Sequence, residues 1–374
     1  MTHLPATVAP PERILMGPGP SNVPPSVLSA MAQPTIGHLD PWFIERMNEV
    51  QAMLREVMQT QNPLTIPISA TGSAGMEACL VNLIESGDRC LVGVNGVFGM
   101  RMADIVERTG GECVRVTAEW GKPIDPQDVK AALAAGKTKL VAIVHAETST
   151  GVLQPVEEIS RLTHEHDALL VLDTVTSLGG HPVLLDEWEV DACYSGTQKC
   201  LSVPPGLSPV SFGPRAIEAL KARKSKVPSW YLDLNMIRAY WGDERTYHHT
   251  APVNMVFALH EGLRLILEEG LQARWDRHQR HHDLLVAGLA EMGISLHPKE
   301  EDSLWTLNAV RVAEGADELA VRKHLLSVYG IEIGGGLGDL KGRIWRVGLM
   351  GYSSTRRNVA LFLTALKDAL ATAL

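Results

Sequence analysis

Short apolar runs alternate with amphipathic segments between residues 66 and 212, and this alternation is the main pattern in the chain. The runs are apolar at nearly every position, whereas a half-exposed strand would be apolar only at every second one. Such strands, separated by helices, are typical of a mostly parallel sheet with helices on both faces. The predicted strands are Ile66–Ser69, Cys90–Val94, Cys113–Val116, Leu140–His145, Leu169–Asp173, Ala192–Ser195 and Pro209–Phe212.

Two long helices are predicted on either side of this region. The first begins at Asp40 and Pro41, an N-cap and a first-turn proline, and the second covers residues 251–271 and ends near Gly270. We predict a domain boundary at the end of the second helix. The apolar stripe of the first helix is Phe43, Met47, Val50, Leu54 and Val57.

The rest of the chain alternates again, with helices predicted over residues 272–292, 316–328 and 353–370 and strands over 303–312 and 343–347. A chain of 374 residues exceeds the length at which one hydrophobic core keeps growing. The predicted architecture is therefore an α/β fold with three parts. They are an N-terminal extension (1–22), a large domain (23–270) and a small C-terminal α+β domain (271–374).

Composition narrows the possible functions. The chain is 45% hydrophobic and 21% charged, with a net charge of −9, so we expect a globular protein without affinity for nucleic acid. No apolar run reaches the ~18 residues of a membrane span, and the first 13 residues lack the apolar core of a signal peptide. Five widely spaced cysteines show no metal-ligand spacing, so we expect reduced packing residues in a cytoplasmic protein.

The turn at residues 70–75 is the first candidate binding element. Small and hydroxyl-bearing residues lead there from the strand Ile66–Ser69 directly into a helical pattern. The free N–H groups and the positive dipole end of such a helix suit a phosphate. An ordinary strand-to-helix turn with a serine cap is the alternative. The turn does not have the spacing of a dinucleotide-binding fingerprint.

Asp173 and Lys199 are the candidate reactive pair. Asp173 ends an apolar strand, where chemistry in open α/β sheets is usually found, and the Glu147–Thr148 pair occupies a similar position. A lysine that binds pyridoxal phosphate needs a carboxylate elsewhere that keeps the cofactor ring protonated. The alternatives are a solvated surface lysine and an aspartate used in a salt bridge or turn cap.

Arg346 lies in the predicted apolar strand 343–347, where an unpaired guanidinium would be costly. Its rigid fork suits bidentate binding of a substrate carboxylate. A structural ion pair inside the small domain is the alternative.

These features, in this order, resemble the class V aminotransferases of the fold-type I pyridoxal phosphate enzymes, and most closely the alanine–glyoxylate and serine–glyoxylate aminotransferase family. The resemblance extends over nearly the whole chain. It is carried by the segments Gly17–Asn22, Asn62–Ile66, His145–Gly151, Asp173–Gly180, Tyr194–Lys199, Pro204–Gly206, Tyr247–Thr250, Gly334–Gly338 and Arg346–Gly351.

The resemblance implies a large domain with a mostly parallel, seven-stranded sheet of the fold-type I kind between helices. It also implies pyridoxal 5'-phosphate as the cofactor and a homodimer with shared active sites. Lys199 would form the Schiff base and shuttle the proton, Asp173 would pair with the ring nitrogen, and Arg346 would bind the substrate carboxylate. The remaining residues implied to hold the cofactor are Thr71, Gly72, Ser73 and Gln198 at the phosphate, Tyr247 and Thr250 at the same phosphate from the neighbouring subunit, Thr148 near the ring hydroxyl, and Val175 and Phe98 on the ring faces.

The implied reaction moves an amino group from a small L-amino acid to glyoxylate by a ping-pong mechanism, giving glycine and a 2-oxo acid. Alanine is the favoured donor and serine the next, because Tyr247–Thr250 resembles the alanine-using branch. Phe98, Ser73 and Thr148 replace a tryptophan, a histidine and a serine of the animal alanine–glyoxylate enzymes, which puts the donor preference in doubt but not transamination.

Three alternatives remain to be compared. (S)-Ureidoglycine–glyoxylate exchange would differ by only a few pocket residues. A cysteine desulfurase of the same class needs a nucleophilic cysteine well downstream of the lysine, and no cysteine follows Cys200. A degenerate binding module would be expected to have lost Lys199, Asp173 or Arg346, and all three are present.

Overall fold

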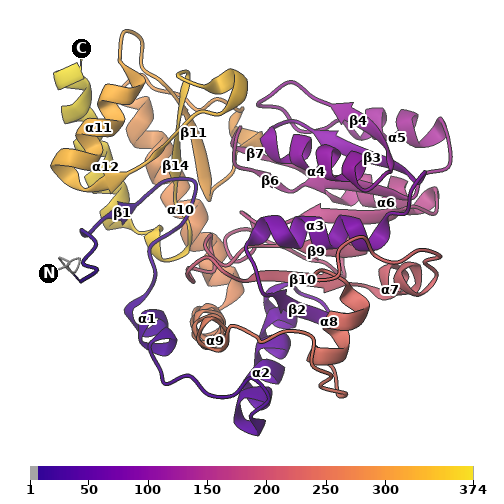
Figure 1. Cartoon of the computed structure of the whole chain (residues 1–374). Coiled ribbons are helices and arrows are strands. Elements are labelled where there is room, and N and C mark those ends of the chain that lie inside the picture. The colour runs from indigo at the N-terminus through magenta and orange to yellow at the C-terminus, as the bar shows by residue number, and fades with distance from the viewer. Residues whose placement is uncertain (1–6, 374) are drawn as a thin grey trace, which may run out of the picture.

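A seven-stranded sheet forms the centre of the large unit in the computed structural model, which describes residues 7–373 (Figure 1). The strand order is β2-β10-β9-β8-β5-β3-β4; β10 is antiparallel to both neighbours and the other pairs are parallel. This is the mostly parallel sheet expected from the sequence. Its strands are β2 (Leu64–Ile68), β3 (Arg89–Val94), β4 (Glu112–Thr117), β5 (Leu140–Val144), β8 (Leu169–Asp173), β9 (Ala192–Tyr194) and β10 (Ser208–Phe212).

Helices cover the sheet, and every residue of β2, β5, β8, β9 and β10 is buried. The predicted stripe of α2 is buried as expected, and Asp40 caps that helix by accepting a hydrogen bond from Trp42 N at 2.8 Å. The helices of this unit are α1 (Pro25–Met31), α2 (Pro41–Val57), α3 (Gly72–Leu83), α4 (Val97–Arg108), α5 (Pro126–Ala134), α6 (Glu157–Glu165), α7 (Pro214–Lys221), α8 (Leu234–Trp241) and α9 (Val253–Glu269).

The C-terminal unit has its own three-stranded antiparallel sheet and its own hydrophobic cluster, with Trp345 and Phe362 fully buried (Figure 1). The strand order is β11-β14-β13. Two predicted elements start later than expected, β11 at Leu307 and α12 at Arg356. The elements are α10 (Leu271–Ala290), β11 (Leu307–Arg311), α11 (Glu318–Tyr329), β12 (Ile331–Glu332), β13 (Gly334–Gly335), β14 (Ile344–Gly348), α12 (Arg356–Ala373) and single 3-10 turns at Glu300–Asp302, Gly338–Leu340 and Gly351–Ser353.

The described part of the N-terminal extension packs on this C-terminal unit. Strand β1 (Ile14–Leu15) pairs in parallel with β12, and Met16 is fully buried in the C-terminal cluster. Met16 N donates to Glu332 O at 2.9 Å, and Gly348 N donates to Met16 O at 2.7 Å. Residues 14–16 thus bond to strands β12 and β14 of the C-terminal unit. The domain boundaries predicted at residues 22 and 270 stay predictions.

Two further findings bear on the expectations from composition. All five cysteines are free thiols, and four of them are buried. Within residues 7–373, no helix is both long enough and apolar enough to cross a membrane.

Gly348 leaves room for the N-terminal segment, and this leads to a stability prediction. A Cβ at Gly348 would lie 2.0 Å from the carbonyl oxygen of Gly17, a backbone atom that cannot rotate away. We expect Gly348→Ala to lower the thermal unfolding midpoint by about 2–5 °C, because overpacking costs roughly 1–3 kcal/mol. Limited proteolysis should also cut the N-terminal segment faster.

Gly136→Ala is the matched control for this prediction, since the nearest atom to its added Cβ would be 3.8 Å away. Circular dichroism melting curves compare the two variants. Equal midpoints for both would show that the N-terminal segment is not held tightly at Gly348.

Candidate active site

A pocket of about 200 Å³ opens at the carboxyl ends of the parallel strands, where the start of α3 faces the turn after β9. The structure brings most of the predicted cofactor residues together here. Those lining the pocket are Thr71, Gly72, Ser73, Phe98, Thr148, Asp173, Val175, Gln198 and Lys199. Residues that the sequence did not single out also line it: Met76, Arg101, Ala146, Thr176 and Tyr194.

One end of the pocket is formed by the N-terminus of α3, which is suited to an anion. The N-cap Thr71 uses its side chain for no capping hydrogen bond, so its hydroxyl is available to a ligand together with the first N–H groups of the helix. A Cβ at Gly72 would lie 3.4 Å from Val175 Cγ2 and would narrow the pocket. The buried Oε1 of Gln198 has no hydrogen-bond partner among the described residues. A half-turn of that amide would direct its NH₂ group to a phosphate.

The floor of the pocket is the carboxylate of Asp173, which is 2% exposed. Its Oδ1 accepts a hydrogen bond from Val175 N at 2.8 Å, and its Oδ2 accepts one from the Tyr194 hydroxyl at 2.7 Å. Burial raises the pKa of Asp173 to about 7, and these two hydrogen bonds oppose the rise. A cation against this carboxylate would restore its charge, as a protonated ring nitrogen would.

Tyr194 is the main pocket residue that sequence reasoning missed. It ends β9, and in the sheet register it is the direct partner of Asp173 at the end of β8. Both strands were predicted, the second as ending at Ser195, but only the strand order shows that they are neighbours. Nothing in the sequence alone shows that the hydroxyl reaches the carboxylate.

Lys199 follows β9 in a turn and is partly buried. Its Nζ donates a hydrogen bond to the carbonyl oxygen of Pro18. Burial is the main cause that lowers the pKa of Lys199 to about 8, and the positive charge of Arg346 adds to it. A Cβ at Gly19, where φ is +110°, would lie 2.7 Å from Nζ. The N-terminal segment therefore passes directly over an amine that is partly neutral near pH 8 and able to act as a nucleophile.

Arg346 reaches this region from β14 of the C-terminal unit. It is 8% exposed, its Nε donates to Gly335 O at 2.7 Å, and burial lowers its pKa to about 10. It is not one of the residues that line the pocket, but its charge acts on Lys199. Among residues 7–373 no carboxylate lies within salt-bridge distance of this guanidinium. A buried arginine in that condition favours an anionic ligand.

Tyr247 and Thr250 lie outside the pocket of their own chain. Both are exposed, Tyr247 to 61%, and the Tyr247 ring centroid lies 5.5 Å from that of His38. Their expected place is the pocket of a neighbouring subunit, and that assignment stays a prediction.

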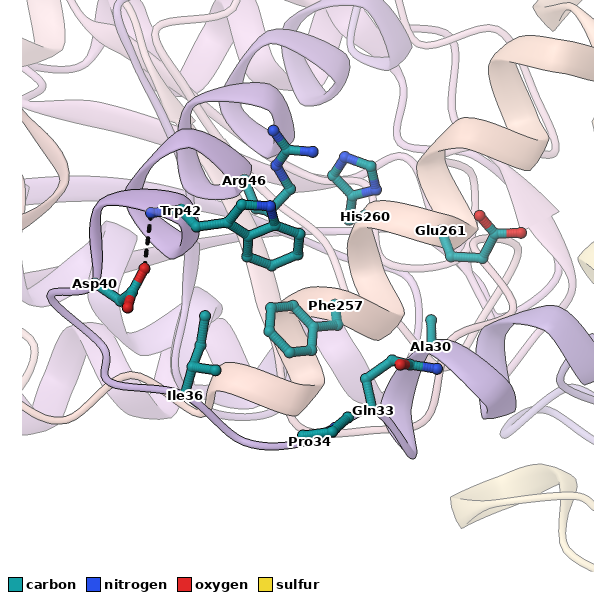
Figure 2. A pocket seen from close by; sticks show the side chains of 10 residues that line it. All are labelled: Ala30, Gln33, Pro34, Ile36, Asp40, Trp42, Arg46, Phe257, His260 and Glu261. Carbon is teal, nitrogen blue, oxygen red and sulfur yellow. Dashed lines mark hydrogen bonds between the residues drawn. The ribbon is translucent and has the colours of Figure 1, made fainter.

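A second, larger pocket of about 600 Å³ lies between α1, α2 and α9 (Figure 2). Trp42 packs edge-on against Phe257 with the ring centroids 5.7 Å apart, and Arg46 Cζ lies 4.9 Å from the centroid of the Trp42 ring. Figure 2 shows these three side chains together with His260 and Glu261. None of the residues predicted as site residues from the sequence lines this pocket.

Comparison with known proteins agrees with this geometry. The family model for aminotransferase class V matches residues 14–340. The (S)-ureidoglycine–glyoxylate transaminase of Bacillus subtilis is 40% identical over 378 residues, which cover 96% of this chain and 91% of that protein. The alanine–glyoxylate aminotransferase of Callithrix jacchus is 41% identical over 364 residues, with 96% and 88% covered.

A solved structure also matches over nearly the whole length. The crystal structure of the alanine–glyoxylate aminotransferase from Nostoc sp. superposes with a TM-score of 0.97 at 48% sequence identity, covering 98% of both chains. This match confirms the predicted fold class. By sequence and by structure, the chain belongs to the class V aminotransferase family of enzymes.

Proposed function

We propose that the protein is a pyridoxal-phosphate-dependent transaminase that moves an amino group from a small L-amino acid to glyoxylate, giving glycine and a 2-oxo acid. The observation that carries the proposal is the convergence of three charged groups from separate segments. They are the Lys199 amine with its pKa near 8, the buried Asp173 carboxylate, and the buried Arg346 guanidinium, which forms no salt bridge within the described residues. The alanine–glyoxylate and ureidoglycine–glyoxylate relatives support glyoxylate as the acceptor.

The residues of the pocket fit pyridoxal phosphate as a cofactor. Thr71, Gly72, Ser73 and Gln198 would hold the phosphate, and Asp173 would face the ring nitrogen. Phe98 and Val175 would enclose the ring, and Thr148 would contact its hydroxyl region, which keeps water away from the reacting atoms. When bound, the cofactor supplies an aldehyde that reacts with amines and a ring that withdraws electrons from the carbon beside the amine.

Lys199 would have two tasks in this reaction. Its Nζ would hold the cofactor covalently between turnovers, and the same amine, once released, would move the substrate proton as a general base. A lysine with its pKa lowered to about 8 is suited to both, because about a tenth of it is neutral at pH 7 and about half at pH 8, far more than for an ordinary lysine. The Pro18 carbonyl accepts a hydrogen bond from Nζ and so gives the free amine a defined position.

Arg346 would bind the carboxylate that both the amino acid and glyoxylate carry. Because glyoxylate has no side chain to recognise, this contact would provide most of its orientation. One guanidinium thus serves both half-reactions of a ping-pong cycle.

The donor is proposed from weaker signals. The two relatives are named for different donors and match the chain at 40% and 41% identity, so identity does not select between them. We place alanine first and serine second, because Tyr247–Thr250 resembles the alanine-using branch, and (S)-ureidoglycine is the alternative. A desulfurase is disfavoured: no cysteine follows Cys200, and burial raises the pKa of the Cys200 thiol to about 12.

We also propose a homodimer in which Tyr247 and Thr250 complete the partner's phosphate site. Their exposure outside their own pocket supports this arrangement. Large exposed side chains, Leu28, Leu39, Trp42 and Trp230 among them, offer apolar surface for such an interface. The free thiols support a cytoplasmic location.

The first test of the proposed function follows the transferred nitrogen. The protein is loaded with pyridoxal phosphate and mixed with glyoxylate and one ¹⁵N-labelled donor at a time: L-alanine, L-serine or (S)-ureidoglycine. We expect labelled glycine by mass spectrometry, formed fastest from alanine. Lys199→Ala should abolish turnover, whereas Lys221→Ala, at an exposed salt bridge with Glu218, should not. No labelled glycine from any donor would refute glyoxylate transamination.

Removal of Arg346 tests the shared carboxylate site. We expect Arg346→Ala to lower kcat/KM roughly 10- to 150-fold for both the donor and glyoxylate, mainly by raising KM, since charge-assisted hydrogen bonds contribute about 1.5–3 kcal/mol. Arg311→Ala is the matched control, because Arg311 is exposed on the neighbouring strand β11 and bonds only to backbone carbonyls. A defect limited to one of the two substrates would remove Arg346 from this role.

Asp173 leads to a pH-dependent prediction for the cofactor-free protein. Because burial raises its pKa from 3.8 to about 7, the folded chain holds a proton between these pH values that the unfolded chain has released. Its contribution to stability therefore falls as the pH rises to 7, and above that the buried charge is destabilising. Asp173→Asn should raise the unfolding midpoint at pH 8 by about 3–6 °C, with a smaller gain at pH 5.

The same substitution should slow turnover, because an amide cannot keep the ring nitrogen protonated. Asp104→Asn, on the exposed side of α4, is the control. A cofactor-free Asp173→Asn protein that melts at or below the wild-type midpoint at pH 8 would contradict the prediction.

A further inference from the structure

The N-terminus of α4 is closed by a buried carboxylate from a distant part of the chain. Glu147 ends the short strand β6 (Ala146–Glu147), which pairs with β7 (Val152–Leu153), and it is fully buried. Its Oε2 accepts hydrogen bonds from Phe98 N at 3.0 Å and Gly99 N at 3.4 Å. The N-cap of α4 is Gly96, which has no side chain to do this, so the cap comes from Glu147 instead.

The other oxygen of Glu147 binds its own loop. Oε1 accepts hydrogen bonds from Ser149 N at 3.0 Å and from the Ser149 hydroxyl at 2.6 Å. The Ser149 oxygen in turn accepts a hydrogen bond from Val97 N at 2.9 Å, the first residue of α4. Glu147 and Ser149 therefore bind successive N–H groups of one helix end, with Thr148 held between them.

The four groups around Glu147 are all donors, and they favour its ionised form. An ionised carboxylate is acceptor-only, whereas a protonated one would direct an O–H toward one of these donors. Burial is the largest influence and leaves the pKa of Glu147 above its ordinary value, while these hydrogen bonds and the positive end of the α4 dipole oppose the rise. The fit is tight: a Cβ at Gly96 would lie 2.4 Å from Glu147 Cδ.

This clamp joins two pocket residues from separate segments, Phe98 in the first turn of α4 and Thr148 between β6 and β7. Phe98 is held through its own N–H, and Thr148 lies between the two clamp residues; both side chains line the pocket. Glu147 itself does not line the pocket. Glu147 can therefore act on a ligand through the residues that it holds, and its charge also raises the pKa of Asp173 and that of Arg346.

We propose that Glu147 is a positioning residue that fixes the ring of Phe98 and the hydroxyl of Thr148 around the cofactor. The proposal rests on the function proposed above, since it takes the pocket as the pyridoxal phosphate site. It assigns Glu147 no contact with cofactor or substrate. A helix cap with a purely structural role is the competing explanation, and the two differ in whether the effect of Glu147 depends on the Phe98 side chain.

A double-mutant cycle on the cofactor-loaded protein separates the two roles. The variants are Glu147→Gln, Phe98→Ala and the double variant, and the measurements are the rate of pyridoxal phosphate loss and the visible circular dichroism of the bound cofactor. Glutamine keeps the volume but turns one acceptor into an NH₂ group that faces other donors. We expect Glu147→Gln to speed cofactor loss on the order of tenfold and to weaken the dichroic signal. In the Phe98→Ala background the further change should be under about twofold.

Two variants complete the experiment. Glu157→Gln removes a carboxylate from the first turn of α6, away from the pocket, and should leave cofactor loss unchanged. If Glu147→Gln does not fold, Ser149→Ala removes a single hydroxyl from the clamp and should speed cofactor loss in the same direction by a smaller factor.

Three results would overturn the proposal. One is a Glu147→Gln protein that retains cofactor like the wild type. Another is an equal effect with and without the Phe98 ring, which would show that Glu147 does not act by positioning that ring. If wild-type protein takes up no pyridoxal phosphate, the proposed function fails and this inference with it; if wild-type uptake is normal and Phe98→Ala weakens it while Glu147→Gln does not, only the inference fails.

Discussion

The buried carboxylate of Asp173 is the constraint on which the rest of the site depends. A charge that is 2% exposed carries a large desolvation cost, which shows as a pKa raised to about 7. The sheet order offsets part of that cost, because β9 lies beside β8 and brings the Tyr194 hydroxyl within 2.7 Å. The turn that follows β9 then carries Lys199 to the same end of the sheet. The position of the reactive amine is thus a consequence of the strand order that supports the carboxylate.

The other half of the site depends on how the C-terminal unit is held against the large one. The N-terminal segment contributes to this connection, since Met16 O accepts from Gly348 N while Pro18 O accepts from Lys199 Nζ. The same short segment, residues 16–18, therefore bonds both to β14, the strand that carries Arg346, and to Lys199. The guanidinium charge contributes to the lowered pKa of Lys199, so the nucleophilicity of the amine is set partly by a residue of the other unit. Any motion between the two units would change both the carboxylate site and the amine.

Sequence patterns predicted those parts of the fold and site that depend on local spacing. The strands of the central sheet, the buried stripe of α2 and the turn into α3 follow from periodicity, and Asp173 stood out because it ends an apolar strand. Tyr194 and Glu147 were not assigned roles, because their partners are set by sheet register and by packing between distant loops. The pairing of β1 with β12 could not be predicted either, since each strand is only two residues long and shows no periodic pattern. Arg346 was suspected from its apolar strand, but the absence of a nearby carboxylate among the described residues needed the structure.

Burial raises the pKa values of Asp173 and Glu147 and lowers those of Lys199 and Arg346, because it disfavours the charged form of each group. The groups differ in which interactions offset this cost of burial. Glu147 is satisfied within the chain by four donors, which suits a residue that only positions others. Within residues 7–373, Asp173 and Arg346 have hydrogen bonds but no salt bridge, and the more distant opposite charges of Lys199 and Glu147, respectively, act on them. The start of α3 presents free N–H groups. In the proposed function the missing charges arrive with the ligands: a ring proton for Asp173, a phosphate for α3 and a carboxylate for Arg346. Since a ligand that binds only the folded state stabilises it by mass action, the cofactor would contribute to the stability of the protein as well as to its chemistry. In the proposed function, Asp173, Arg346 and the start of α3 would then be the groups that bind ligands. Glu147, whose hydrogen bonds are all made within the chain, would only position its neighbours.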